Sequence, residues 1–368
     1  MFYTLGHVAQ AGAFDAITSD DAFLVHQLRL LPASWTTPYP AVYPPQVALL
    51  MRPFALVSYW QGFAVLVLLS ITTCLGTVWR MAATRPRLAR WPRHVLMLTA
   101  ASPILWTLVV QGQISALALT SLFVAWVSLR TGHRALAGAA LGVLAYKAPL
   151  FVPAMAVCLL AGEWTMVASG VAAAVAQYVI PVPWVGWETV TAYLAHLLRL
   201  AQSPDTLAKN LVLMHSWRTF WTAITPATVA QVAYAVTATT TVIGTAWVWR
   251  RLHDPLHRIA VLGAAIVLAS PHLYAYDLVL LIPLVVASAD LALSQAHSRR
   301  LWALTAAGYF APMWSIPVAL LDIQGSTPVL AAWLVEFSRG ALVHAEDRPP
   351  IYRRGAKTAV VTTGSPAR

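Results

Sequence analysis

Charged side chains are scarce in this sequence. Only 10% of its 368 residues are Asp, Glu, Lys or Arg, compared with about one quarter in an average soluble domain. Hydrophobic residues make up 59% of the chain, so water cannot be its main solvent. The composition excludes an ordinary soluble globular protein and indicates one domain embedded in a membrane.

Cysteines and cofactor motifs are also few. The two cysteines, Cys74 and Cys158, lie inside apolar runs and lack the spacing of metal ligands. The run Ser19-Asp20-Asp21 offers two carboxylates without further ligands, which is typical of a solvated turn rather than a metal site. The sequence has no Gly-rich nucleotide-binding motif. We therefore expect no metal and no cofactor.

Eleven apolar runs indicate helices within a hydrocarbon layer of roughly 30 Å. They are Val57 to Trp79, Val95 to Val110, Ile114 to Leu129, Ala135 to Tyr146, Pro149 to Leu160, Met166 to Pro181, Val229 to Trp249, Ile259 to Ser270, Leu278 to Leu293, Leu301 to Leu321 and Thr327 to Val343. The short runs that meet at Gly112, Lys147 and Pro271 are expected to turn before the far surface. The predicted fold class is an all-α polytopic transmembrane helix bundle of about 10 to 11 membrane segments.

Basic residues recur in short breaks between the apolar runs. The formal charge of +11 therefore forms no single patch, and no nucleic-acid partner is expected. The basic breaks are Arg80 to Arg93, Arg130 and Arg134, Arg250 to Arg258, Arg299 and Arg300, and the tail from Arg348 to Lys357. They alternate with breaks that are nearly free of Lys and Arg, so the positive-inside rule places them in the cytoplasm. Function is expected on the opposite, outer face.

The chain divides into a membrane domain and a tail. Residues 1–343 are expected to form the transmembrane domain, with outer loops at 1–56 and 182–227. Residues 344–368 are polar, which is typical of a disordered cytoplasmic tail. Because residues 1–56 must reach the outer face with no apolar run before them, we expect that a first helix is missing ahead of Met1. The expected location is the cell membrane, as a multi-pass protein.

Ionisable groups near membrane depth are functional candidates because placing them there is costly. The turn from Ser270 to Asp277 places an imidazole, two phenols and a carboxylate between two apolar helices. His272 and Asp277 can share a proton or accept one from a sugar hydroxyl. The alternative is that the tyrosines are interfacial anchors and that Asp277 caps the next helix.

Three further clusters lie on the expected outer face. Lys147 stands between two apolar helices, where it suits a phosphate or carboxylate partner or snorkels to the surface. Gln113 lies in an uncharged turn whose amides can bond sugar hydroxyls, or which only joins two helices. The outer loop from Trp184 to Trp221 carries aromatic rings and cations, among them His215 and Arg218, that suit a sugar ring and a lipid phosphate.

Three stretches of the sequence also occur in a recognisable order. They are Tyr43-Pro44-Pro45 with Leu49 to Leu56, Gly112-Gln113 with Ala137-Gly138 through Lys147 and Pro149, and Ser270-Pro271-His272 through Asp277. From about Phe2 to Pro283 the chain resembles glycosyltransferase family 87, a GT-C superfamily group that includes polyprenyl-phosphate-mannose-dependent mannosyltransferases and arabinofuranosyltransferases. In that family an Asp normally precedes a Phe-Tyr or Tyr-Tyr pair by a few residues. Here the pair is Phe2-Tyr3, so the resemblance implies an Asp ahead of Met1.

The resemblance implies a GT-C-like fold and a membrane glycosyltransferase. Such an enzyme transfers mannose or another hexose or pentose from a polyprenyl-phosphate donor to an acceptor hydroxyl, on a lipid or glycan, at the outer face. His272 and Asp277 are predicted to be catalytic. The predicted substrate-binding residues are Lys147 and Arg218 for the phosphate, Gln113 and Tyr276 for the sugar or acceptor, and Tyr43, His215 and Asn210 beside them. Two alternatives stay open: a transporter or flippase of lipid-linked sugars, although the sequence shows no two related halves, and a catalytically inactive GT-C relative.

Overall fold

The computed structural model describes residues 1–30, 39–202, 214–294, 299–314 and 325–346. Across these ranges the chain forms helices and no β-strand, and several helices are long and apolar enough to cross a membrane. The prediction of an all-α polytopic helix bundle is therefore confirmed. The predicted tail from 347 onward, Asn210 and the region around Asp322 lie outside the described residues.

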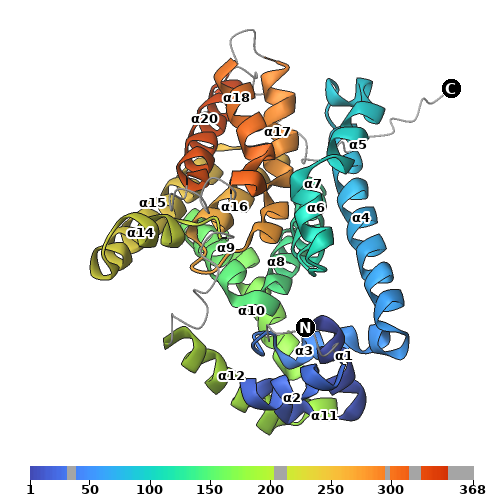
Figure 1. The fold of residues 1–368 in the computed structure, drawn as a ribbon. Helices are drawn as coiled ribbons and strands as arrows, with labels where there is room; N and C mark the ends of the chain where they lie inside the picture. The colour runs from blue at the N-terminus through green and yellow to red at the C-terminus, as the bar shows by residue number, and fades with distance from the viewer. Residues whose placement is uncertain (31–38, 203–213, 295–298, 315–324, 347–368) are drawn as a thin grey trace, which may run out of the picture.

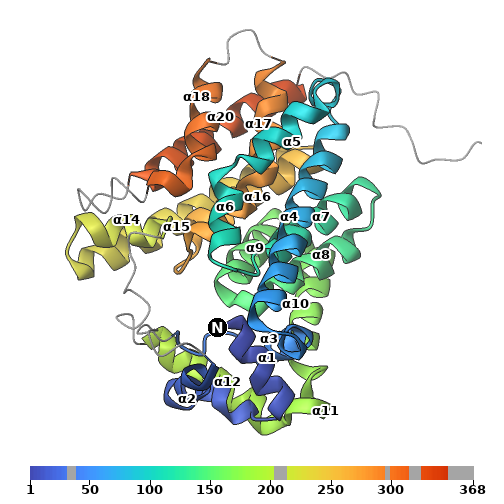
Figure 2. The same cartoon turned by 45° about the vertical axis from the view of Figure 1, so that its right-hand side comes forward.

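Most described residues of the segments expected as outer loops form a layer of short helices at one end of the bundle (Figures 1 and 2). These helices are α1 (Phe2–Ala11), η1 (Phe14–Thr18), α2 (Asp20–Leu30), α3 (Pro45–Met51), η2 (Arg52–Leu56), α11 (Val182–Val185) and α12 (Trp187–Gln202). The Tyr193 hydroxyl of α12 donates to the Val42 carbonyl at 3.1 Å, and His196 lies 3.6 Å from the Asp20 carboxylate. The described residues of 1–56 (1–30 and 39–56) and α12 therefore pack as one unit, which we call the cap layer.

The remaining described helices form the bundle. They are α4 (Tyr59–Ala83), η3 (Leu88–Arg90), α5 (Pro92–Ala100), α6 (Pro103–Val110), α7 (Ala116–Arg130), α8 (Arg134–Gly142), η4 (Val143–Lys147), α9 (Ala148–Ala161), α10 (Trp164–Val179), α14 (Trp217–Ile224), α15 (Ala227–Arg251), α16 (Pro255–Ala269), η6 (Ala275–Leu281), α17 (Ile282–Ala292), α18 (Arg299–Tyr309), η7 (Ala311–Trp314) and α20 (Ser326–Glu346). Among the described residues, five helical runs pass a test of length and apolarity for a membrane span, or six if the α5 and α6 pair, bent by 45°, is one span. Other predicted segments, such as α7 and α16, are helical but shorter.

One of these five runs, Arg134–Ala161, is folded back on itself. A straight helix of its 28 residues would be roughly 42 Å long at 1.5 Å per residue. Instead Arg134 at its start lies 2.9 Å from the carboxylate of Glu163, just past its end. The ion pair shows that this run is not one straight membrane-spanning helix. Instead α8, η4 and α9 form a helical hairpin with Lys147 at its tip. This agrees with the turn that the sequence predicts at Lys147.

Glycines hold the hairpin against α10. A Cβ atom on Gly138 would stand 2.2 Å from the Met166 carbonyl oxygen, and one on Gly142 would stand 2.4 Å from the Gly170 carbonyl oxygen. Only the absence of a side chain at both positions allows α8 and α10 to approach so closely. The close packing fixes where the hairpin ends and therefore where Lys147 lies.

Ion pairs join the basic breaks at one end of the bundle, which we call the basic end. The Arg85 guanidinium binds both oxygens of Asp254 at 2.5 and 2.6 Å. Glu163 receives the Arg134 guanidinium, and Arg258 lies 3.6 Å away from the same carboxylate. The structure thus brings breaks that are far apart in the sequence to the same end, as the charge alternation predicts.

The length of each helix determines how far its other end lies from the basic end. The helices α7, α9 and α16 contain 15, 14 and 15 residues and rise roughly 21 to 22 Å from the basic end. Their far ends therefore stop inside a hydrocarbon layer of about 30 Å, whereas the 25-residue helices α4 and α15 continue past them. The turns at these three far ends meet on the side of the bundle that faces the cap layer, where Tyr43 of the cap layer stacks on Tyr146.

Candidate functional site

A buried ion pair lies where these three turns meet. The Lys147 ammonium, at the tip of the hairpin, contacts Oδ2 of Asp277 in η6, and the Asp277 side chain is completely buried. The Ser115 hydroxyl, at the start of α7, donates to Oδ1 of the same carboxylate at 2.7 Å. Three turns that are distant in the sequence therefore meet at one carboxylate.

The local sequence explains how Asp277 is held. Ser270 ends α16, its hydroxyl donates to the Pro149 carbonyl at 2.7 Å, and the chain then turns into the short helix η6. Asp277 is the third residue of η6, and Oδ2 accepts the Tyr274 amide N–H at 3.3 Å. The carboxylate thus caps its own helix, as the alternative reading of the sequence expects, and also binds Lys147 and Ser115.

His272 lies on the partly exposed side of the centre. Its ring packs edge-on against Tyr274, with 4.9 Å between ring centroids. Burial, and then the nearby Lys147 and Arg218 cations, lower the pKa of His272 to about 3. The imidazole is therefore neutral at pH 7 and can accept a proton or a hydrogen bond.

Arg218 approaches the same turn from α14. One guanidinium nitrogen, Nη1, donates to the Pro271 carbonyl at 3.3 Å, which places the positive charge beside His272. Asp277 balances the Lys147 charge, but within the described ranges no ion pair balances Arg218. The centre therefore carries a local excess of positive charge that suits an anion such as a phosphate.

Aromatic rings line the cap-layer side of the centre. Tyr43 stacks on Tyr146 with 6.4 Å between centroids and an interplanar angle of 9°. The Lys147 ammonium lies 4.9 Å from the centroid of the Tyr276 ring, a cation–π contact. Burial, and then the neighbouring Tyr146 and Asp277, raise the pKa of Tyr43, so its phenol stays neutral. These faces suit the apolar side of a sugar ring.

The structure places the other predicted residues less centrally. Gln113 lies two residues before Ser115, and its side-chain oxygen is buried without a hydrogen-bond partner among the described residues. The His215 ring is buried against the start of α20, where Nδ1 lies 2.7 Å from the Ser326 hydroxyl. Burial lowers the pKa of His215 to about 4. His215 therefore helps to join α14 to α20, while Asn210 lies outside the described residues.

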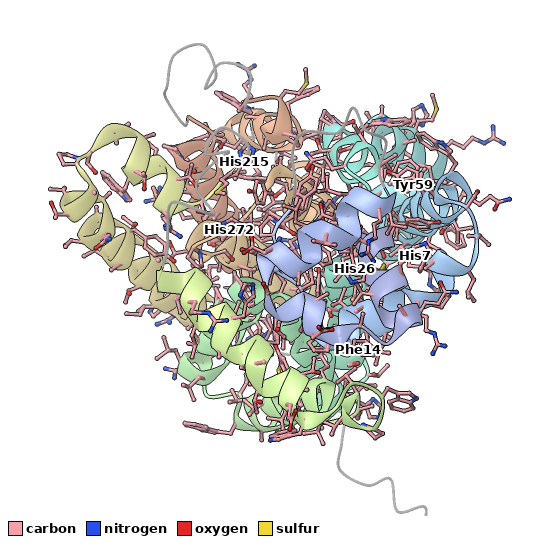
Figure 3. All side chains as sticks on the ribbon, turned by 60° about the horizontal axis from the view of Figure 1, so that its bottom comes forward. His7, Phe14, His26, Tyr59, His215 and His272 are labelled. Carbon is pink, nitrogen blue, oxygen red and sulfur yellow. The ribbon has the colours of Figure 1, made fainter. Side chains whose placement is uncertain are left out.

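Figure 3 looks onto the end of the molecule that carries the cap layer. His215 and His272 lie between the amino-terminal helices on one side and α14 and α15 on the other. Their segments are joined directly, because the His215 amide donates to the Leu273 carbonyl at 3.2 Å. His272 is therefore bordered by the cap layer on one side and by α14 and α15 of the bundle on the other.

The sequence did not single out Ser115 as a site residue, although it ends the Gln111 to Ser115 turn. A serine beside an apolar helix carries no charge signal, and its partner Asp277 is 162 residues away. The acidic pair Asp20 and Asp21 instead opens α2, where Asp20 accepts the Ala41 amide at 3.0 Å. The described residues contain no group of three His, Cys, Asp or Glu side chains placed to hold a metal ion.

The geometry brings together a neutral imidazole, two cations and several aromatic rings on the cap-layer side of the bundle. No curated protein and no solved structure shows significant similarity to the chain. The family model of glycosyltransferase family 87 matches residues 41–271, which are more than half of the 368 residues and include Lys147 and the start of the Ser270 turn. This polytopic membrane protein therefore belongs to glycosyltransferase family 87.

Proposed function

We propose that the protein transfers a sugar from a polyprenyl-phosphate donor to an acceptor hydroxyl on the outer face of the cell membrane. The observation that carries this proposal is the meeting of Lys147, Asp277 and Ser115 beside His272 and Arg218 on the cap-layer side of the bundle. A lipid phosphate would approach this centre from the bilayer, whereas a water-soluble nucleotide donor would have to cross the cap layer. Family membership supports the transfer of a sugar.

In the proposed reaction the acceptor oxygen attacks the anomeric carbon of the donor sugar. The bond from that carbon to the phosphate oxygen breaks, the polyprenyl phosphate leaves with the bonding electrons, and the acceptor hydroxyl loses its proton to a base. Lys147 and Arg218 stabilise the negative charge of the donor and leaving phosphate. Gln113 and Tyr276 contact the donor sugar or the acceptor.

His272 is proposed as the group that accepts the proton. A base with a pKa of about 3 is weak, because the Lys147 and Arg218 charges oppose its protonation. A bound phosphate offsets those two charges and raises the basicity of the imidazole when the donor is in place. Asp277 is buried at the Lys147 ammonium, so its part in the reacting centre is to hold that ammonium in position.

Transfer of radiolabel from a polyprenyl-phosphate [14C]mannose donor tests the proposal. Membranes containing the full chain are given this donor and a membrane lipid extract as the source of acceptors. We expect His272→Ala to lower the rate by about 10²-fold or more, the usual size of a general-base contribution. Arg218→Gln is expected to raise the KM for the donor, because it removes the unbalanced cation.

Two exposed residues supply matched controls. His253→Ala and Arg29→Gln change the same residue types at exposed positions away from the centre, and they should leave the rate unchanged at equal protein levels. Movement of labelled lipid across vesicles without any transfer would instead support the flippase alternative. Equal rates for His272→Ala and His253→Ala would exclude His272 as the base.

A further inference from the structure

Several glutamines in this chain have clear structural partners. The amide nitrogen of Gln27 donates to the Tyr39 carbonyl at 2.6 Å, and its amide oxygen accepts the Tyr39 N–H at 3.1 Å. The Gln177 amide donates to the Gly142 carbonyl at 2.7 Å. These amides join segments of the fold, as buried amides normally do.

Gln46 differs from them. It lies in the first turn of α3, and among the described residues its buried amide nitrogen and oxygen make no hydrogen bond of regular geometry; the polar side chain that interacts with it is Tyr178. The Tyr146 hydroxyl, beside Ser115, and the Gln113 amide oxygen are likewise buried without a hydrogen bond of regular geometry in the same described ranges. Leaving such groups unpaired disfavours folding, so a ligand that pairs them is a physical reason for their presence.

The three groups border the same turn. Gln46 lies beside the Tyr178 hydroxyl, and that hydroxyl lies 3.5 Å from the Ala145 carbonyl in η4. Tyr146 follows in η4 and precedes Lys147, and Gln113 belongs to the turn that supplies Ser115 to Asp277. An amide and a phenol thus lie at η4, and the second amide oxygen belongs to the turn that supplies Ser115 to the same centre.

We infer that Gln46, together with Tyr146 and Gln113, binds the hydroxyl groups of the acceptor sugar. The assignment to a neutral sugar follows from the chemistry, because a primary amide and a phenol each donate and accept, as a sugar hydroxyl does. The stacked rings of Tyr43 and Tyr146 add an apolar face next to these groups.

The order of contacts separates this subsite from the donor phosphate. Arg218 contacts the Pro271 carbonyl beside His272, whereas Gln46 interacts with Tyr178, whose hydroxyl lies 3.5 Å from the Ala145 carbonyl. The phosphate is expected at the Arg218 end, so the end at Gln46 is left for the acceptor. This inference rests on the proposed function in its choice of acceptor over donor.

Removing a buried amide should lower the melting temperature of the free protein if the amide stabilises the fold. It should not lower the melting temperature if the amide serves to bind a ligand. Gln46→Met keeps the size of the side chain and removes the two unpaired atoms, so the melting temperature of the free protein should stay equal or rise. Gln27→Met is the matched control, since it removes two hydrogen bonds and should lower the melting temperature. Tyr146→Phe should behave like Gln46→Met.

Binding is measured on the full chain in lipid nanodiscs. The probes are methyl α-mannoside, methyl β-glucoside and methyl α-arabinofuranoside, and the readout is the rise in melting temperature that each causes. We expect at least one glycoside to stabilise the wild type and Gln27→Met but not Gln46→Met. In the transfer assay Gln46→Met should raise the KM for the acceptor about tenfold or more, with the KM for the donor unchanged.

Three results would overturn the inference. They are a fall in melting temperature for Gln46→Met as large as that for Gln27→Met, an equal glycoside response in Gln46→Met and wild type, and no glycoside response in the wild type. Failure of the proposed function is seen separately, as a wild-type protein that transfers no sugar. The melting experiment decides the sugar subsite even then.

Discussion

The Lys147 ammonium contacts the Asp277 carboxylate although 130 residues separate them in the chain. Lys147 is at the tip of the α8 to α9 hairpin, and Asp277 is in the helix that follows α16. Neither charge would be stable alone at this depth, because a buried charge needs a partner. The site and the membrane fold therefore depend on the same contact.

The first prediction concerns this ion pair. Lys147→Met or Asp277→Asn leaves one buried charge unpaired and should lower the free energy of unfolding by about 3 to 5 kcal/mol. The double substitution removes both charges and should recover most of that stability while transfer remains lost. Unfolding in mixed micelles with increasing SDS measures the stability of all three variants. A double variant as unstable as the sum of the singles would show that the two side chains do not interact.

The second prediction concerns pH. With a pKa of about 3, His272 in the free protein does not titrate between pH 5 and 8. An unfolded histidine binds a proton below about pH 6.5, so this ring should make the folded state less stable as the pH falls from 6.5 toward 3. His272→Gln removes that dependence. We expect the stability of His272→Gln to fall less than that of the wild type between pH 7 and pH 4.5 in the same SDS titration.

The cations beside His272 supply the matched test. Arg218→Gln removes one of the charges that lower its pKa, so the imidazole should protonate at a higher pH than in the wild type. The rate of acylation of His272 by diethyl pyrocarbonate, followed by peptide mass spectrometry across pH 4 to 8, reports the neutral ring. An unchanged profile in Arg218→Gln would mean that the guanidinium does not act on His272.

The third prediction concerns the hairpin. Gly138→Ala places a methyl group against the Met166 carbonyl and should force α8 away from α10, at a cost of about 1 to 3 kcal/mol. Because Lys147 is carried by the same hairpin, the rate of sugar transfer should also fall. Gly244→Ala in α15 is the control, since its Cβ atom meets nothing within 4 Å. Equal stability of the two variants would show that close packing at Gly138 is not required.

The bundle and the polar turns could be predicted from the sequence for simple physical reasons. Apolar runs separated by basic breaks give helices, and a lone Lys147 between two short runs marks a turn because a full span would bury its charge. The contact of Ser115 with Asp277 could not be predicted, since an uncharged serine looks the same in a helix cap and in a site. The helices of residues 1–56 were not expected either, because their stability comes from packing on one another and on α12 rather than from a periodic apolar pattern.

The fourth prediction concerns sidedness. The charge alternation puts the basic end in the cytoplasm and the cap layer outside, so cysteines introduced at the two ends should react from opposite sides. Gln10 in α1 and His133 between α7 and α8 are both exposed, whereas the native Cys74 and Cys158 are buried and should give no background. A membrane-impermeant maleimide should label Gln10→Cys in intact cells and His133→Cys only after permeabilisation. Labelling of both residues from the same side would contradict this topology. A donor at the outer face could then not be placed next to Lys147.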